Sequence, residues 1–530
     1  MRIVIRDIRL SVESDEKEAC RCAERQLNSV FGRDGYAEVS VYRASVDARH
    51  TNKLSRVYSV CAEVYSDAIS AETLAKLNAT VLEEGGLDIA YGDKCLKHPP
   101  LIVGFGPAGM FCALVLAENG YNPIVIERGS DIERRYEAVR LFREKGVLDT
   151  ECNVQFGAGG AGTFSDGKLV TRINDKKCRY VLETYKKHGA PASILTNAKP
   201  HIGTDNLGKI VTSVKNAIEQ HGGRVLFDTR LDGYRKTSDG IVAETSKGQL
   251  VCSSLILATG HSSRDTYRML AEKGLYMSPK QFSVGVRVEQ SREKINRAIY
   301  GKYADILGNA EYNFSHRRGE RAVYTFCMCP GGHVVEAASE ENSVVVNGMS
   351  DYARGGRNSN AALVVSVDKN DFGSGLFDGI AFQRSLEQRA FNMGGRNYGA
   401  PMQTVGAYLD GRVDRSFGGI TPTYMDGNRY TLCDLNSLFP PIVNSFLKEG
   451  LVRFERKING FAPMDALLTG AETRTSSPLR MDRTEGLCSL SDEDIFPCGE
   501  GAGYAGGITS ASVDGIRVAL QIMERYKPFT

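Results

Sequence analysis

Leu101-Ile102-Val103-Gly104-Phe105-Gly106-Pro107-Ala108-Gly109 is an apolar run followed by the spacing Gly-x-Gly-x-x-Gly. It predicts a short strand, a tight turn and a helix that runs to about Asn119. In such a unit Gly104 allows the turn, Gly106 lets the backbone approach a pyrophosphate, and Gly109 lets the helix pack on the strand. The helix directs its N-terminal N–H groups at the phosphates.

The next predicted strand, Pro123 to Ile126, ends at Glu127, about 20 residues after Gly106, the spacing expected for a ribose-binding acid. A carboxylate there accepts hydrogen bonds from ribose hydroxyls and repels a 2′-phosphate, so the predicted nucleotide is FAD or NAD and not NADP. The glycine spacing alone is a weak signal, because the chain has 56 glycines. Strand, turn, helix, second strand and terminal acid together favour a nucleotide over an empty turn.

Two later segments favour FAD. Leu255 to Gly260 is an apolar strand that ends in Ala-Thr-Gly, and Asp494 to Pro497 is a strand that leads into Gly499-Glu500 and a glycine-rich turn before a helix. With the first motif, these segments resemble the two-dinucleotide-binding-domain flavoproteins of the glutathione-reductase fold type. The resemblance implies that an acidic residue near the end of the chain binds the ribityl chain of FAD. The family has Asp at this position, and this sequence has Glu500. The resemblance also implies that helix-start amides near 507–509 stabilise the reduced flavin.

More of the chain resembles one subgroup, the uncharacterised FAD-dependent dehydrogenases with a small N-terminal α/β domain. The matching runs are RASVDAR (43–49), FGAGGAGTFSDGKL (156–169), HIGTD (201–205), GHSSRD (260–265) and FCMCPGG (326–332). Because this family has no firmly established substrate, the resemblance implies FAD and a fold but no reaction. It also implies that the loop 157–162 wraps the flavin and pyrophosphate with its backbone amides; a glycine-rich surface loop is the alternative.

The predicted cofactor-binding residues come from the first motif, the acidic strand end, the glycine loop and the later strand ends. They are Gly104, Gly106, Pro107, Ala108, Gly109, Glu127, Arg128, Gly159, Gly160, Ala161, Gly162, Thr163, Leu231, Thr259, Gly260, Gly499, Glu500, Gly507, Ile508 and Thr509. No catalytic residue is assigned, because a flavin performs the redox chemistry and the protein supplies position, electrostatics and at most a proton.

Composition excludes several classes of protein. The chain has 66 Lys and Arg against 64 Asp and Glu, and this net charge of +2 argues against a nucleic-acid partner held by a strong overall field. Residues 1–12 lack the apolar core of a signal peptide, and the run 101–117 is too short and glycine-broken to span a membrane. We expect a cytoplasmic protein whose 13 cysteines are reduced, and no metal, since neither close cysteine pair has a second pair at zinc-site spacing.

The pattern of elements predicts an α/β chain with three domains. A Rossmann-like FAD-binding domain of the glutathione-reductase type covers 98–275 and 490–530, and a β-rich α+β substrate domain, 276–489, is inserted into it. The small N-terminal α/β domain, 1–97, reads as strand, helix, two strands and a helix over 71–82, an order that suits a ferredoxin-like fold.

Cysteine, lysine and histidine side chains supply candidates for chemistry. Cys327 and Cys329 alternate on a predicted strand and could face the flavin as a dithiol, although we favour a segment that lines the substrate side, with a close turn at 330–332. Lys168 could lie beside the flavin or in solvent. His261, His316 and His333 are candidates for proton transfer, yet a lone histidine is more often structural.

The arginines have two interpretations each. Arg287 and Arg354 could hold an anionic substrate, and surface ion pairs are at least as common. Arg264 and Asp265, which are neighbours in the chain, could form a structural ion pair.

These observations predict hydride transfer between the flavin N5 and a small organic substrate bound in a cleft between domains. No second Gly-x-Gly-x-x-Gly lies in a strand–turn–helix frame, so NAD(P)H is expected at most as a transient electron donor. Two alternatives stay open. One is a flavin monooxygenase, and the other is a non-catalytic flavin-binding module whose N-terminal domain engages RNA or a protein.

Overall fold

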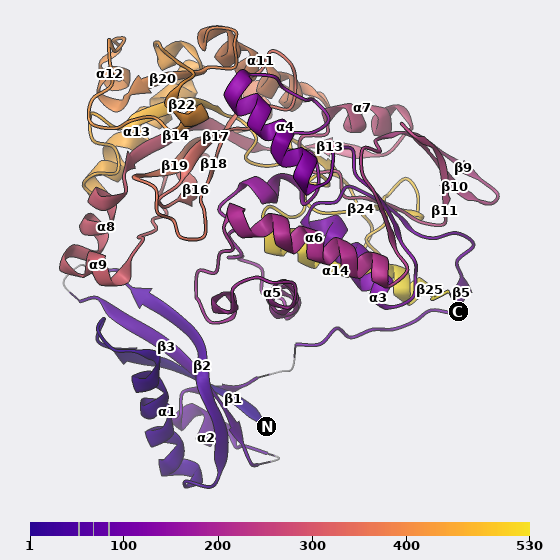
Figure 1. Cartoon of the computed structure of the whole chain (residues 1–530), viewed down its shortest axis with the longest axis vertical. Coiled ribbons are helices and arrows are strands. Elements are labelled where there is room, and N and C mark those ends of the chain that lie inside the picture. The colour runs from indigo at the N-terminus through magenta and orange to yellow at the C-terminus, as the bar shows by residue number, and fades with distance from the viewer. Residues whose placement is uncertain (51–52, 67, 83–84, 530) are drawn as a thin grey trace.

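A computed structural model gives the structure of residues 1–50, 53–66, 68–82 and 85–529. The chain forms three units around three main sheets: an N-terminal unit, a parallel-sheet unit to which the C-terminal segment returns, and a seven-stranded unit between them in sequence (Figure 1). Within the described ranges, no helix is long and apolar enough to cross a membrane.

The N-terminal unit is an antiparallel sheet of order β2-β3-β1-β4 with α1 packed on it. Its elements are β1 (Arg2–Leu10), α1 (Glu16–Phe31), β2 (Tyr36–Asp47), β3 (Ser55–Val64), α2 (Ala71–Lys76) and β4 (Ala79–Val81). This is the βαββαβ order of a ferredoxin-like unit. The helix predicted over 71–82 is wrong in its second half, because Asn78 turns the chain at φ 48° and residues 79–81 pair with Ile3–Ile5 as a strand.

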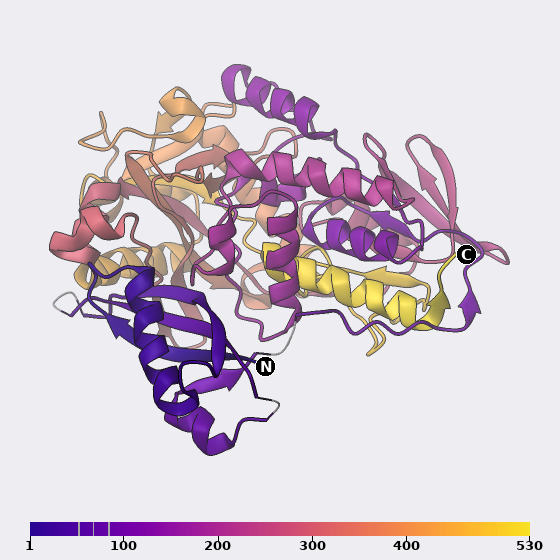
Figure 2. The ribbon, with the colours of Figure 1, turned by 60° about the horizontal axis from the view of Figure 1, so that its bottom comes forward.

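The hairpin of β2 and β3 connects the N-terminal unit to the other two. The Ala44 N–H donates to the Thr196 carbonyl at 2.7 Å, and the Ala198 N–H donates back to Ala44 at 2.9 Å. Val46 and Ala48 pack against the core of the seven-stranded unit. The N-terminal unit therefore touches both remaining units, as Figure 2 shows.

The parallel sheet has the order β24-β12-β6-β7-β8, so its edge strand β24 comes from the C-terminal segment. Its strands are β6 (Leu101–Val103), β7 (Ile124–Ile126), β8 (Arg224–Leu226), β12 (Leu255–Leu257) and β24 (Ile495–Pro497). The longer helices around it are α3 (Pro107–Glu118), α4 (Ile132–Lys145), α5 (Lys177–Lys187), α6 (Thr204–Gln220), α7 (Arg264–Glu272) and α14 (Ile508–Arg525). The unit also contains the short helices η1 (Gly160–Phe164) and η2 (Ala192–Leu195), the small sheet β9 (Leu231–Thr237), β10 (Gly240–Thr245) and β11 (Gly248–Cys252), and the pair β5 (Lys94–Cys95) with β25 (Tyr526–Lys527).

α14 lies directly against α3, although the two helices are far apart in sequence (Figure 1). A Cβ on Gly515 of α14 would lie 2.1 Å from the Ala108 carbonyl oxygen, so this approach requires glycine. All residues of α3 from Ala108 to Ala117 are buried. The close packing brings the start of α14 to the same end of the parallel sheet as the start of α3.

The seven-stranded sheet has the order β15-β16-β19-β14-β22-β20-β21. These strands are β14 (Phe282–Ser291), β15 (Ser315–Arg318), β16 (Arg321–Cys329), β19 (Asn358–Val367), β20 (Ala400–Thr404), β21 (Tyr430–Leu432) and β22 (Leu467–Glu472). The other strands of the unit are β13 (Met277–Pro279), β17 (His333–Glu336), β18 (Val346–Met349) and β23 (Leu479–Met481). Its helices are α8 (Arg292–Tyr300), η3 (Gly301–Tyr303), α9 (Ala304–Leu307), α10 (Lys369–Phe372), α11 (Asp378–Met393), α12 (Val405–Asp410), η4 (Tyr424–Gly427), η5 (Leu435–Ser437) and α13 (Pro441–Lys457).

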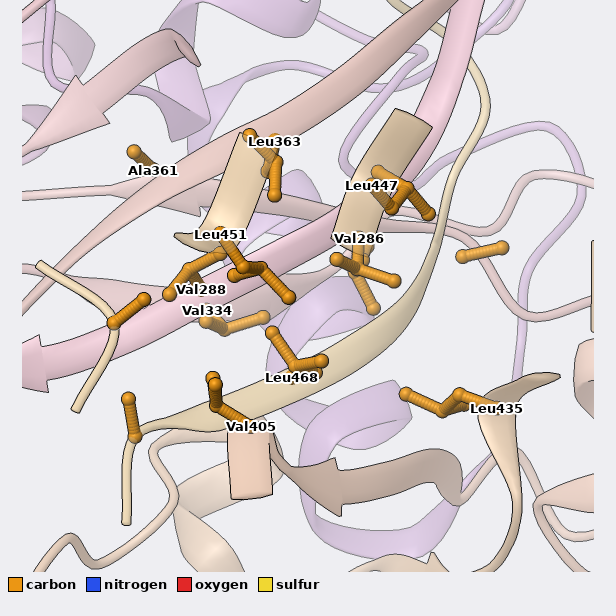
Figure 3. Close-up of a cluster of buried hydrophobic side chains, with 14 of the residues drawn as sticks. Val286, Val288, Val334, Ala361, Leu363, Val405, Leu435, Leu447, Leu451 and Leu468 are labelled. Carbon is orange, nitrogen blue, oxygen red and sulfur yellow. The ribbon is translucent and has the colours of Figure 1, made fainter. Parts of the chain in front are cut away.

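The two faces of this sheet differ in polarity. Val286 and Val288 of β14 pack with Leu447 and Leu451 of α13 in an apolar core (Figure 3). Successive side chains of a strand point to opposite faces, so Arg287 lies on the other face, where it is fully buried. A buried charged face must be paired, and the groups that pair it are described below.

Candidate functional site

The Gly-x-Gly-x-x-Gly segment forms the predicted turn between β6 and α3. The Gly104 N–H donates to the Ile126 carbonyl at 2.8 Å, and φ at Gly104 is 106°, where a side chain would be strained. A Cβ on Gly109 would lie 2.0 Å from the Gly104 carbonyl oxygen. At Gly106, by contrast, an added Cβ would meet only the Gly160 Cα, at 3.8 Å. The protein's own packing therefore requires glycine at 109 and leaves open space at 106.

α3 and α14 both begin at a glycine, Gly106 and Gly507, so neither helix has a side-chain cap. The first N–H groups of a helix lack partners within it and carry partial positive charge. The two starts lie against one glycine, because a Cβ on Gly162 would be 3.4 Å from Ile508 Cγ1 and 3.7 Å from Pro107 Cγ. Two uncapped helix starts beside one glycine loop form a place suited to an anionic group.

Glu127 ends β7, as predicted, and three backbone amides already engage its carboxylate. Oε1 accepts from the N–H groups of Gly129 at 3.0 Å and Gly157 at 2.9 Å. Oε2 accepts from the Phe105 N–H at 2.8 Å. An ionised carboxylate offers about four acceptor positions, so one remains for a ribose hydroxyl. Glu127 thus ties the first glycine turn to the glycine loop, a role that the sequence interpretation missed.

The glycine loop lies beside the first turn, but it uses most of its own amides. Gly159 N–H donates to the Phe105 carbonyl at 2.8 Å, Ala158 N–H to Ser130 at 3.0 Å and Gly160 N–H to Gly157 at 2.9 Å. The expectation that the loop's amides face a cofactor is therefore wrong for Gly157–Gly160. Contact of Ala161, Gly162 and the Cα atom of Gly160 with a cofactor stays a prediction. The Thr163 hydroxyl is also engaged, by the Ala158 carbonyl at 3.1 Å.

Arg135 of α4 supports the glycine loop, and no sequence motif pointed to it. Its guanidinium is fully buried and donates to three backbone carbonyls, those of Asn153 at 3.0 Å, Val154 at 3.0 Å and Ala158 at 2.6 Å. A guanidinium has five N–H donors in a fixed plane, so it can fix three carbonyls of one loop. Because α4 carries several other charged residues, the sequence around Arg135 does not distinguish it from a surface arginine.

The end of β12 carries a buried hydroxyl without a partner. Thr259 follows the strand next to the Gly104 turn, and within the described part of the chain its buried Oγ1 has no hydrogen-bond partner. The Gly260 carbonyl, by contrast, accepts from Ser263 Oγ at 3.0 Å. Buried polar atoms without partners are uncommon in proteins, so the Thr259 hydroxyl fits contact with a bound group.

The end of β24 packs onto the start of α3. A Cβ on Gly499 would lie 2.7 Å from Ala108 Cβ, and the Gly499 N–H donates to Asp514 Oδ2 at 2.7 Å. The next residue, Glu500, is partly exposed, and no hydrogen bond to its carboxylate occurs among the described residues. In α14, the Thr509 hydroxyl donates to the Leu169 carbonyl at 2.8 Å. Glu500 is therefore the acid at this end of the sheet that stays available to a ligand.

The chain is similar to known sequences over its whole length. A family model described as FAD-dependent protein, C-terminal domain-like, matches residues 281–475. An uncharacterised protein of Clostridium beijerinckii is 42% identical over 546 residues, which cover 99% of each chain. The chain belongs to this family of FAD-dependent proteins.

Solved structures give a looser likeness to this FAD-dependent protein. CtdE in complex with FAD is 12% identical, with a TM-score of 0.32 and coverage of 81% of this chain and 86% of CtdE. Glycine oxidase from Bacillus cereus is 11% identical, with a TM-score of 0.31 and coverage of 81% of this chain and 96% of the oxidase. Both TM-scores are low, so neither likeness carries an argument about the reaction.

FAD, the cofactor, fits the residues described above. Its diphosphate is an anion, and the uncapped starts of α3 and α14 suit an anion beside the open space at Gly106. Its hydroxyl groups match the acceptor position left on Glu127, the free carboxylate of Glu500 and the unpartnered Thr259 hydroxyl.

Two predicted cofactor residues of the FAD-dependent protein lie in structural contacts. Arg128 forms ion pairs with Asp265 and Glu151, and its guanidinium lies 4.4 Å from the centroid of the Phe156 ring. Leu231 is buried in a core cluster at the start of β9. The structure therefore gives both side chains packing or pairing roles, and their contact with FAD stays a prediction.

The predicted pairing of Arg264 with Asp265 is wrong. Asp265 pairs with Arg128, and the buried Arg264 donates two hydrogen bonds of 2.8 Å to Glu387 of α11. Glu387 also accepts from Arg474, at 3.1 and 3.2 Å. Neighbours on a helix point in different directions, so adjacency in sequence did not make a pair. Glu387 and its two arginines instead join the seven-stranded unit to the residues that follow Thr259.

Glu387→Gln is expected to lower the free energy of unfolding by about 3–5 kcal/mol near neutral pH, because it removes the buried anion that Arg264 and Arg474 share and leaves Arg264 paired with the partly exposed Glu340, at 2.6 Å. Burial opposes ionisation of Glu387, but the charges of Arg264 and Arg474 outweigh it and hold the pKa well below the ordinary value of 4.5. A carboxylate with a lowered pKa in the folded state stabilises the fold above its unfolded pKa.

Urea unfolding from pH 8 to 3 measures this effect. The difference between Glu387→Gln and the natural protein should be constant down to about pH 5 and should shrink as the pH falls further. Glu341→Gln, at an exposed carboxylate on the same unit, is the control and should change stability little. A Glu387→Gln protein as stable as the natural one at pH 7 would contradict the assigned network.

Neither Arg287 nor Arg354 lies in a surface ion pair, and neither is free to hold an anionic substrate. Arg287 donates to Glu472 at 2.7 Å and to the Cys327 carbonyl at 2.8 Å. Arg354 pairs with Asp166 and with Glu311, the latter at 2.9 Å. Both arginines are therefore paired within the protein, and the Arg354 pair reaches Asp166, which follows the glycine loop.

Three of the four remaining candidate side chains have protein partners. Lys168, placed beside the flavin or in solvent by the sequence, donates to the Met328 carbonyl and lies 3.8 Å from Asp166. His261 contacts the Arg474 carbonyl at 2.9 Å, and His316 pairs with Glu449 at 2.9 Å. His333 is exposed at the start of β17. These contacts agree with structural roles for the first two histidines.

Residues 327–332 form the end of β16 and a turn that packs against Arg354. Gly331 turns at φ 54°, and a Cβ there would lie 1.9 Å from the Arg354 carbonyl oxygen, so the turn after Cys329 requires glycine. Lys168 touches Met328, its neighbour Leu169 accepts from Thr509, and Thr509 lies in the first turn of α14. The cysteine segment is thus connected through two contacts to the helix start predicted to lie at the flavin.

Proposed function

We propose that this FAD-dependent protein is an oxidoreductase of the glutathione-reductase fold type that transfers hydride between the flavin and a small organic substrate. One observation carries the proposal: the uncapped starts of α3 and α14 lie against the same glycine, Gly162. A site that binds only a nucleotide needs one such start. A second one fits a cofactor whose diphosphate and redox-active ring bind at separate places.

The chain's own residues have distinct tasks in this proposal. The start of α3 and the open space at Gly106 hold the diphosphate, and Glu127 accepts a ribose hydroxyl. Glu500 accepts from the ribityl chain. The start of α14, at 507–509, places its positive end where a reduced ring carries negative charge. FAD itself supplies the hydride chemistry.

The substrate would bind where the seven-stranded unit meets the glycine loop. Lys168 contacts Met328, so the two units meet there. Phe326, two residues before Met328 on β16, is 44% exposed. The arginines of this face are already paired, so substrate recognition falls to the exposed apolar and partly exposed polar groups at its edge. An uncharged or weakly polar substrate fits these groups best.

Anaerobic flavin bleaching against a panel of reduced metabolites, with NADH and NADPH included, tests the proposal. The expected result is bleaching by one class of organic donor and reoxidation by an organic acceptor without hydroxylated product. Hydroxylated product formed with oxygen would assign the protein to the monooxygenases. A flavin that photoreduction cannot reduce would instead indicate a binding module, and either result would overturn the proposal.

A further inference from the structure

The cysteines of β16 lie in an irregular part of the strand. Phe326 pairs with Ala362 and Cys329 pairs with Asn360, so β16 has one residue more than β19 between these pairs. Cys327 takes up the irregularity with φ 43°, a left-handed conformation that is costly for a residue with a side chain. Such bulges redirect a side chain, and they occur often next to active sites.

The surroundings of the two thiols are unequal. The Cys329 thiol is buried and donates to the Cys327 carbonyl at 3.4 Å, whereas Cys327 is partly exposed beside the exposed Phe326. The neighbouring Cys329 side chain, with the positive charges of Arg287 and Lys168, lowers the pKa of Cys327, although burial opposes this. The neighbouring Cys327 side chain and burial raise the pKa of Cys329. The partly exposed cysteine is therefore the one with the lowered pKa, and the buried cysteine is the one with the raised pKa.

We propose that Cys327 and Cys329 form a reversible redox pair that reduces small disulfides, with Cys327 as the attacking thiol. The Cys327 thiolate attacks one sulfur of the disulfide, forms a mixed disulfide and releases one thiolate. Cys329 then gives up its proton, attacks Cys327 and releases the second thiol. The pair loses two electrons as its own disulfide forms, and the small disulfide gains the same two electrons. The inference uses no flavin chemistry, so it stands apart from the proposed hydride transfer.

Glutathione disulfide is the probe, applied to the reduced, FAD-containing protein. Trypsin releases residues 322–354 as one peptide, in which Cys327 and Cys329 are the only cysteines. After treatment, mass spectrometry should find this peptide lighter by two hydrogen atoms and unable to react with an alkylating agent until it is reduced. Recovery of the peptide with two alkylated thiols under these conditions would overturn the proposal.

Two variants assign the roles of the thiols. Cys329→Ser should trap glutathione on Cys327, because the resolving thiol is missing. Cys327→Ser should react at Cys329 at least about tenfold more slowly, because that thiol is buried and its pKa is raised. Equal rates in the two variants would contradict the assignment.

A comparison within the unmodified protein avoids any folding defect of the variants. Cys178 and Cys433 are also partly exposed, but burial raises the pKa of both thiols. At pH 6.5, iodoacetamide should therefore alkylate Cys327 about tenfold faster than either of them. Alkylation of all three at similar rates would show that the bulge does not activate Cys327.

Discussion

Gly106→Val should yield a folded protein that retains less than about a tenth of the FAD bound by the natural protein. The protein leaves room for a Cβ at this position, since the nearest atom is the Gly160 Cα at 3.8 Å, and φ at Gly106 is −84°, which valine adopts without strain. The added side chain would instead occupy the path of the diphosphate beside the start of α3. Flavin absorbance per chain and the melting temperature of the FAD-free forms measure the two effects separately.

Gly109→Val is the matched control for this experiment. Its Cβ would lie 2.0 Å from the Gly104 carbonyl oxygen, so this variant should lose its fold as well as its FAD. Gly106 thus leaves space for the ligand, whereas Gly109 is required by the packing of the protein itself. Normal FAD content in folded Gly106→Val would refute the placement of the diphosphate.

Glu127→Ala should destabilise the protein even without FAD, by about 3 kcal/mol or more. Three buried N–H groups, those of Phe105, Gly129 and Gly157, lose their common acceptor, and each buried donor without a partner costs roughly 1–3 kcal/mol. The same change removes the ribose acceptor, so FAD retention should fall too. Urea unfolding of the FAD-free natural protein and variant measures the structural part.

Glu127→Gln separates the two roles of this side chain. Its remaining carbonyl oxygen can accept from two amides, while the new NH₂ group faces a third donor, so its loss of stability should be smaller than that of Glu127→Ala. An acid that served only the ribose would leave the FAD-free stability unchanged in both variants. That result would contradict the role assigned here.

Features of the fold that depend on a few adjacent residues could be predicted from the sequence. The turn at Gly104–Gly109 and the acid at Glu127 follow from backbone needs that a few adjacent residues express. The first five elements of the N-terminal unit, in the order βαββα, followed from the hydrophobic pattern. The end of α2 did not, because the apolar residues of 77–82 suit a helix or a strand, and only pairing with Ile3–Ile5 decides between them.

Contacts between residues far apart in the chain could not be predicted from the sequence. Arg264 pairs with Glu387 and Arg287 with Glu472, and in each case the partner lies more than a hundred residues along the chain. Burial then decides the role of these charges, and burial is a property of the whole fold. For the same reason the sequence could not show that the amides of 157–160 are used within the protein.

Hydrogen–deuterium exchange with and without FAD measures whether the cofactor lies at the two helix starts. If FAD binds at the starts of α3 and α14, its removal should speed exchange in the segments 104–108, 161–163 and 507–509. The α13 amides, on the apolar side of the seven-stranded sheet, should exchange at the same rate in both forms. Unchanged exchange in those three segments, with protection by FAD elsewhere in the chain, would contradict the account.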